Sequence, residues 1–158
     1  MGITISTHGG STYNLDHNRR TKKVVQNQTH IEKSGWHESW YDADEREIYK
    51  SVFSQAQHAY NRKTKRKDRQ IDCYYEKVKK DGKLKTGYEL IVGIGSRENP
   101  VDPKLSYSIL RKWFAGWKNR NPNFRLLGCH WHADEPDAQA HLHVTYLPFA
   151  DGYKQGIG

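Results

Sequence analysis

The stretch FRLLGCHWHADEPDAQAHLHVTYLP, residues 124–148, carries four histidines on two neighbouring apolar segments. Residues 124–132 and 140–148 are mostly apolar or aromatic, and the polar segment between them contains a proline. This pattern predicts two strands joined as a hairpin, with the turn centred on Pro136–Asp137.

The register of this hairpin decides where the histidines point. Alternate residues of a strand share a face, so His130 and His132 point the same way, as His141 and His143 do. The turn sets His132 opposite His141 and His130 opposite His143, and cross-strand partners project to one face. We therefore expect all four imidazoles to converge, with Asp134 beside them.

Four histidines on one face favour a bound cation. Protonated imidazoles repel one another, whereas neutral imidazoles can share a metal ion. Three nitrogen ligands that leave coordination positions open are typical of a catalytic metal site. The alternative is a group of half-buried polar histidines, which is the usual explanation for a single HxH pair.

The rest of the chain mixes helical and strand patterns. The expected elements are strands at 3–6 and 88–96, a short helix with a loop within 14–32, and helices at 42–63, 71–80 and 102–122. Together with the hairpin, this order predicts an α+β fold with a largely antiparallel sheet backed by helices. A chain of 158 residues is long enough to bury a core, so we expect one domain, residues 1–158.

Two of these helices have patterns that set their limits and their buried side. Asp42 stands three residues before Glu45, as in a capping box, so helix 42–63 is expected to begin at Asp42. In helix 102–122, the spacing of apolar residues predicts one buried side. Its members are Leu105, Ile109, Trp113 and Trp117.

The net charge of +8 favours a polyanionic partner. The densest basic run lies at residues 62–69, and it is either a solvated helix end or a patch that contacts phosphates. Its basic residues are Arg62, Lys63, Lys65, Arg66, Lys67 and Arg69.

The two cysteines, Cys73 and Cys129, lie far apart and lack CxxC spacing. They form neither a zinc knuckle nor a disulfide framework, so we expect a cytoplasmic protein. No apolar run approaches the roughly 18 residues of a membrane span, so no membrane contact is expected for this domain.

A metal site in a basic, aromatic-rich chain points to phosphodiester chemistry, which needs a polarised phosphate and a nucleophile. The four histidines supply no free nucleophile. The upstream segment DHNRR, residues 16–20, offers His17 with Asn18 and Arg20 beside it. Tyr13, four residues before His17, is the competing candidate.

Together these two regions resemble the MobV-type mobilisation relaxases, also called plasmid recombination (Pre/Mob) enzymes, within the HUH endonucleases. The segment HNRR, residues 17–20, is similar to their N-terminal HNxR motif, and Leu142 fills the apolar position of their HUH motif. Their metal motif, HxDE followed by HxH and a proline, is matched by His132, Asp134, Glu135, His141, His143 and Pro148. The spacer before HxH is longer than usual in the family, and Ala140 stands where the family has proline.

The resemblance implies a relaxase palm, an antiparallel sheet backed by helices, that acts as a nuclease on single-stranded DNA at an origin of transfer. It implies that His17 attacks the scissile phosphate and stays bonded to the 5′ phosphate. Glu135 would orient or deprotonate His17, and Arg20 would steady the phosphate. The implied ligands of a Mn²⁺ or Mg²⁺ ion are His132, His141 and His143, with His130 as an additional imidazole that could replace one of them.

Two alternatives remain open from the sequence. A rolling-circle replication initiator of the same superfamily usually places its catalytic tyrosine after the HUH motif, where this chain has only Tyr146 and Tyr153. A non-catalytic nucleic-acid-binding module would use its aromatic residues to stack on bases and would keep the histidines as structural residues.

Overall fold

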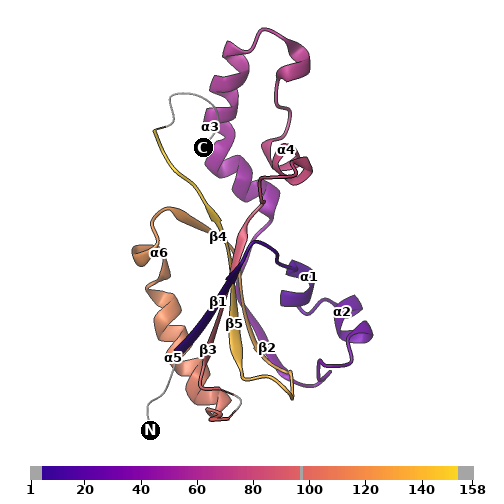
Figure 1. The fold of residues 1–158 in the computed structure, drawn as a ribbon, viewed down its shortest axis with the longest axis vertical. Coiled ribbons are helices and arrows are strands. Elements are labelled where there is room, and N and C mark those ends of the chain that lie inside the picture. Colours follow the sequence, from indigo (N-terminus) through magenta and orange to yellow (C-terminus); the bar gives the residue numbers. More distant parts are fainter. Residues whose placement is uncertain (1–4, 97, 153–158) are drawn as a thin grey trace.

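A five-stranded antiparallel sheet, with strands in the order β1-β3-β5-β4-β2, forms the centre of the computed structural model, which describes residues 5–96 and 98–152. The strands are β1 (Ile5–Gly10), β2 (Trp36–Asp42), β3 (Tyr88–Ile94), β4 (Phe124–Ala133) and β5 (His141–Pro148). Helices flank the sheet on both sides and extend beyond one end of it (Figure 1). The predicted α+β fold, an antiparallel sheet backed by helices, is confirmed.

The hairpin of β4 and β5 has the predicted register. His132 lies opposite His141, and His130 lies opposite His143. A register shift does occur in this pair, between Leu126 and Gly128. It lies towards the start of β4, so the pairing of the histidines is unaffected.

Strand β2 was not predicted. It forms the edge of the sheet beside β4, and Asp42 is its last residue, paired with Gly128. The prediction that Asp42 caps the next helix is therefore wrong, because the backbone of Asp42 belongs to the strand ladder. Helix α3 (Glu45–Lys63) is capped by Asp44, whose side chain accepts hydrogen bonds from the N–H groups of Arg46 and Glu47.

One face of the sheet packs against α5 (Pro103–Ala115) and α6 (Trp117–Arg120), two helices that replace the single helix expected at 102–122. The buried residues of this core are Val92, Ile94, Leu110, Trp117, Cys129, Trp131, Ala140, Leu142 and Val144. Leu105 was expected among them, but it is 48% exposed. The stripe that faces the sheet runs through Ser106 and Leu110, and Leu105 lies outside it in the first turn.

Helices α3 and α4 (Tyr74–Lys80) lie beyond one end of the sheet (Figure 1). They enclose a second core of Tyr49, Phe53, Tyr75, Val78, Leu127 and Leu147. The distal part of α3 leads away from the sheet to a single 3-10 turn, η1 (Lys67–Arg69). The helix expected at 71–80 is confirmed from Tyr74 onward.

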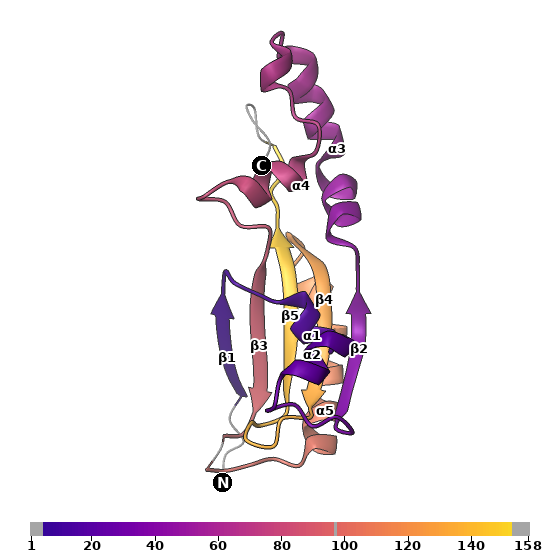
Figure 2. The same ribbon diagram turned by 90° about the vertical axis from the view of Figure 1, so that its right-hand side faces the viewer.

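Two short helices, α1 (Leu15–Asn18) and α2 (Lys22–Asn27), lie on the sheet face opposite α5 (Figures 1 and 2). The side chain of Asn14 caps α1 by accepting a hydrogen bond from the N–H of His17 at 3.1 Å. The single short helix expected within 14–32 is thus a pair. The strand expected at 3–6 is found from Ile5, while residues 3 and 4 lie outside the described part of the chain.

Candidate active site

The histidines project from the face of the sheet that α1 and α2 cover. The register sets His37, His132 and His141 in one row across three strands, with His130 and His143 in the next row. The ring centroid of His132 lies 5.4 Å from that of His141 and 4.7 Å from that of His143. The predicted convergence is confirmed for His132, His141 and His143, whereas His130 shares their face but has no ring contact with them.

His141 and His143 approach each other through their Nε2 atoms, which are 3.0 Å apart. The Nδ1 of His141 donates to the carbonyl oxygen of Gln139 at 2.8 Å, and the Nδ1 of His143 is 3.2 Å from Oε1 of Glu89. When the Nδ1 atom of each ring carries the proton, the lone pairs on the two Nε2 atoms face each other. Two nitrogens bound at about 2.1 Å to one ion lie about 3 Å apart when the bonds meet at a right angle, so this pair fits a shared metal.

His132 is almost completely buried, with 1% of its surface exposed. Its Nε2 donates to the main-chain oxygen of Asn18 at 2.7 Å, so the lone pair is on Nδ1. That Nδ1 is buried without a hydrogen-bond partner, and burial lowers the pKa of His132. A neutral imidazole is the form in which histidine binds a metal.

Three groups of donor atoms in the described part of the chain are compact enough to hold one ion; one of them, His17, His30 and Glu135, contains none of the predicted ligands. The other two are His17, His132 and His143, and His132, Glu135 and His141; within each group the donor atoms lie within 4.8 Å of one another. The predicted ligands are divided between these last two groups, and His132 belongs to both. Imidazole nitrogens with one carboxylate suit a divalent transition-metal ion.

His17 lies above these residues on α1. Its ring centroid is 5.8 Å from that of His132 and 6.0 Å from that of His143. The Nδ1 of His17 donates to Oε1 of Gln28 at 2.8 Å, which leaves the lone pair on Nε2. Burial lowers the pKa of His17, so its ring is neutral near neutral pH.

Arg20 connects His17 to the β4–β5 hairpin. Its side chain is completely buried, and Nη1 donates to Nε2 of His17 at 2.9 Å. Nε and Nη2 donate to the two carboxylate oxygens of Asp134 at 2.7 and 2.6 Å, and Nη2 also donates to Glu135 at 2.6 Å. The backbone of Arg20 has a φ of 51°, a left-handed conformation that is uncommon outside glycine and is typical of functional sites.

Glu135 lies beside the proposed nucleophile. Its Oε1 is 3.7 Å from Nε2 of His17. Burial opposes the charge of this carboxylate most strongly, but the hydrogen bond from Arg20 and the charges around it together lower the pKa of Glu135. The three residues that the resemblance implied for catalysis, His17, Arg20 and Glu135, therefore lie together.

Two polar residues of this region were not predicted. Glu89, on β3, is only 9% exposed and contacts both His143 and Asn18. Its one signal in the sequence is a charged residue within a strand whose other members are apolar or glycine. Gln28, which follows α2, belongs to no pattern that would single it out.

The tyrosines considered as alternative nucleophiles do not contact the histidines in the described part of the chain. The hydroxyl of Tyr13 donates to Glu45 at 2.5 Å and lies 2.8 Å from the hydroxyl of Thr86. Burial and the bond to Glu45 raise the pKa of Tyr13. Tyr146 stacks on Phe124, with ring centroids 4.6 Å apart, on the sheet face opposite the histidines. Tyr153 lies outside the described residues.

His130 points to the same face as the other histidines but has different partners. It is fully buried, and its Nδ1 is 2.9 Å from the hydroxyl of Ser39. Its Nε2 is 4.0 Å from Asp42. None of the three compact groups of metal donors in the described residues includes His130.

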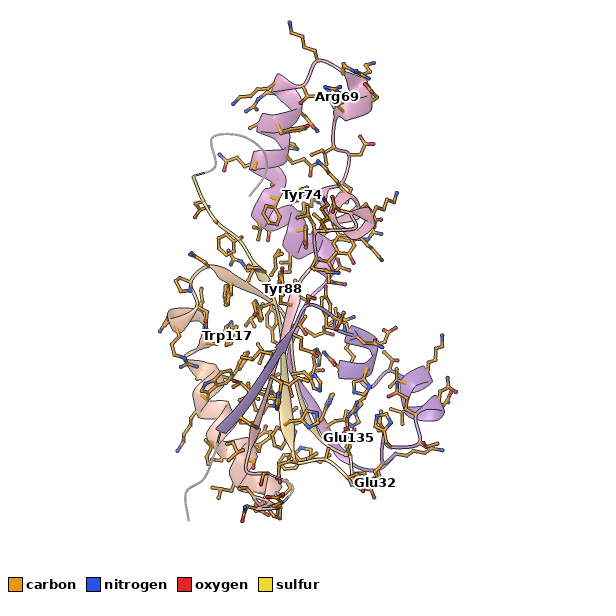
Figure 3. The ribbon with its side chains drawn as sticks, in the orientation of Figure 1. Glu32, Arg69, Tyr74, Tyr88, Trp117 and Glu135 are labelled. Atoms are coloured by element: carbon orange, nitrogen blue, oxygen red, sulfur yellow. The ribbon has the colours of Figure 1, made fainter. Side chains whose placement is uncertain are left out.

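The basic run at 62–69 is not part of this site. It occupies the end of α3 and the 3-10 turn η1, and its six basic side chains are exposed. Together α3 and η1 form an arm that extends beyond the sheet, here called the α3 arm. Figure 3 shows Arg69 at the distal end of this arm, remote from Glu135. Arg66 forms a local ion pair with Asp68.

The family model described as plasmid recombination enzyme, Mob_Pre, matches residues 14–155. The chain belongs to this family. The match includes His17, the β4–β5 hairpin and the basic arm between them. Comparisons with curated proteins and with solved structures gave no match.

Membership of the plasmid recombination enzyme family confirms the resemblance seen in HNRR and in the histidine pattern. It makes DNA the partner of this chain and plasmid recombination or mobilisation the process it serves. The net charge of +8 agrees with a DNA partner. Among the described helices, none is long and apolar enough to span a membrane.

Proposed function

We propose that this plasmid recombination enzyme is a relaxase, which nicks and rejoins one strand of single-stranded origin DNA with the help of Mn²⁺ or Mg²⁺. The reaction would serve the mobilisation of a plasmid or another mobile element. The observation that carries the proposal is the position of His17. Its lone pair on Nε2 is beside Arg20 and Glu135, and its ring lies against two histidines that could hold a metal.

The proposed ligands are His132, His141 and His143. A divalent ion bound to them would polarise the scissile phosphate. The outer nitrogens of His132 and His141 donate hydrogen bonds to Asn18 and Gln139, and that of His143 lies 3.2 Å from the carboxylate of Glu89. Such outer contacts fix the tautomer and the orientation of each ring before substrate arrives.

The attack starts at Nε2 of His17. Its lone pair forms a bond to phosphorus, and the bond from phosphorus to the 3′ oxygen breaks. The 5′ phosphate stays on the enzyme as a phosphoramidate, and the departing 3′ oxygen takes a proton from water. The Nδ1 proton remains on the ring, where Gln28 accepts its hydrogen bond. Attack by the 3′ hydroxyl on this adduct rejoins the strand.

Arg20 and Glu135 prepare His17 for this step. Nη1 of Arg20 donates to the lone pair that would attack, so an oxygen of the substrate phosphate has to take over this hydrogen bond. That exchange frees Nε2 and gives the phosphate a cationic donor. Because the pKa of His17 is already lowered by burial, we assign Glu135 an orienting role and no role as a base.

The basic run on the α3 arm is proposed to contact DNA phosphates away from the nick. Its exposed basic side chains lie at the distal end of the arm, and exposed lysines and arginines bind phosphates by releasing counterions. Contacts there would hold the DNA without taking part in the chemistry.

The test is a cleavage assay on labelled single-stranded origin DNA, with and without Mn²⁺, followed by analysis of the covalent adduct. The His17→Ala variant is expected to bind DNA and metal but to form no adduct, whereas Tyr13→Phe is expected to cleave. A phosphohistidine adduct decomposes in acid and survives base, while a phosphotyrosine adduct survives acid. An acid-stable adduct that disappears in Tyr13→Phe and persists in His17→Ala would identify a tyrosine relaxase and overturn the proposal.

A further inference from the structure

Glu89 is a buried carboxylate on the histidine face that takes no direct part in the reaction described above. It projects from β3, next to β5 and on the same face as His143 and Thr145. Its Oε1 is 3.2 Å from Nδ1 of His143 and accepts a hydrogen bond from Nδ2 of Asn18 at 2.6 Å. Burial opposes its charge, but the contacts with His143 and Asn18 prevail and lower the pKa of Glu89.

We propose that Glu89 is the positioning residue of the metal site, acting on His143 directly and on His132 through Asn18. This inference rests on the proposed metal-dependent function. The contact between Glu89 and His143 brings a carboxylate to 3.2 Å from the outer nitrogen of a ligand, the pairing found in a carboxylate–histidine–metal triad, in which the carboxylate accepts a hydrogen bond from that nitrogen. The carboxylate keeps the proton on Nδ1, so that Nε2 presents its lone pair, and it makes that nitrogen a stronger donor.

Asn18 extends this effect to a second ligand. Its side chain is held by Glu89, and its main-chain oxygen accepts the hydrogen bond from Nε2 of His132 at 2.7 Å. Asn18 is itself 3% exposed and directly follows His17 in α1. One chain of contacts therefore joins both ligands to the helix that carries the nucleophile.

The location of Glu89 makes a purely structural role a poor explanation. A buried carboxylate is costly unless it is paired, and an apolar residue would fill the same space without that cost. Glu89 is instead paired with residues that themselves belong to the metal site and to α1. Its negative charge also offsets that of a divalent cation held one imidazole ring away.

The experiment measures Mn²⁺ affinity in the absence of DNA, by electron paramagnetic resonance of the free ion, for the wild type and three variants. Glu89→Gln keeps an acceptor oxygen for Asn18 and His143 but has no charge, and its Mn²⁺ affinity is expected to fall about tenfold. Glu89→Ala removes the acceptor as well, and up to about a hundredfold loss is expected. Glu38→Gln is the matched control: Glu38 is an exposed carboxylate of β2 on the sheet face opposite the histidines, so this variant should bind Mn²⁺ like the wild type.

The thermal midpoint of the metal-free proteins separates positioning from folding. A tenfold weaker affinity in Glu89→Gln with an unchanged midpoint supports the proposal, as does a shifted ¹⁵N resonance of the His143 ring. Wild-type affinity in Glu89→Gln would overturn the role of Glu89 alone and leave the metal site standing. A wild-type protein that binds no Mn²⁺ would overturn the metal site, and the role of Glu89 with it.

Discussion

The guanidinium of Arg20 forms two hydrogen bonds to the carboxylate of Asp134, which lies 114 residues further along the chain. Both side chains are fully buried. This pair joins the turn after α1 to the end of β4, and so fixes the nucleophile segment against the histidine hairpin. Gly35 packs directly on Asp134, where a β-carbon at position 35 would collide with the aspartate.

Breaking the Arg20–Asp134 ion pair is expected to lower the stability of the folded protein. Asp134→Ala leaves a buried arginine without its main partner, which should lower the free energy of unfolding by about 3–5 kcal/mol. The neighbouring Arg19 is the control, because its ion pair with Asp42 is partly exposed. Arg19→Ala should cost less than about 1 kcal/mol. Urea denaturation measures both, and equal losses would show that the buried pair has no special role.

The metal ligands can be tested without DNA. A ligand that binds only the folded protein raises its thermal midpoint, so saturating Mn²⁺ should stabilise the wild type. Replacing His132, His141 or His143 by alanine should remove most of that shift. His130→Ala should lower the midpoint through a lost core contact but keep the shift, because His130 bonds to Ser39. Loss of the shift in His130→Ala and its retention in His132→Ala would reverse the assignment of these two residues.

Gln28 is expected to set the tautomer of His17. In Gln28→Leu the Nδ1 proton has no acceptor, so part of the His17 population should carry its proton on Nε2, where it cannot attack. ¹⁵N NMR of histidine-labelled protein reports the tautomer. The rate of adduct formation should fall about tenfold, the equivalent of roughly 1.4 kcal/mol and within the range of one hydrogen bond.

Two further variants test this role of Gln28. Gln28→Glu keeps an acceptor and should restore the tautomer. Gln26→Leu makes the same substitution at an exposed position of α2 and should behave as the wild type. A wild-type tautomer in Gln28→Leu would contradict the role.

The register of the β4–β5 hairpin could be predicted from the sequence, because the alternation of histidines with apolar residues and the proline in the turn leave few registers open. It could not reveal β2, since the segment WHESWYD mixes aromatic and charged residues and becomes a strand by pairing with β4. Asp42 and Asp44 are both able to cap α3, and only the strand ladder excludes the first. Gln28 contacts His17 across 11 residues of the chain, and Glu89 on β3 contacts His143 on β5. The placement of both residues therefore depends on the tertiary fold.

The basic arm should contribute to DNA affinity through charge alone. Neutralising Lys63, Lys65 and Lys67 with glutamine should weaken binding to single-stranded DNA and reduce the slope of log affinity against log salt by about 2. The control carries the same number of changes on the helices behind the sheet, at the exposed residues Lys104, Lys112 and Lys118. Fluorescence anisotropy over a salt series measures the slopes. If both triple variants give one slope, the arm is a solvated surface.

Acid should destabilise the metal-free protein through its buried histidines. Burial lowers the pKa of His130 from 6.5 to about 4, and burial also lowers the pKa values of His17, His132 and His141. Between pH 6.5 and 4 the unfolded chain binds a proton at His130 that the folded chain does not. Protonation therefore favours unfolding, and the free energy of unfolding falls as the pH is lowered through this window.

Urea denaturation across this pH window measures the effect. His130→Gln removes one titrating group, so its slope of stability against pH should be lower by up to one proton, about 1.4 kcal/mol per pH unit. His58→Gln changes an exposed histidine on α3 and should leave the slope as it is in the wild type. Saturating Mn²⁺ should move the acid transition to lower pH, because ions bind the neutral form of their ligands. A wild-type slope in His130→Gln would mean that this imidazole does not titrate with unfolding and that its burial adds nothing to the acid sensitivity.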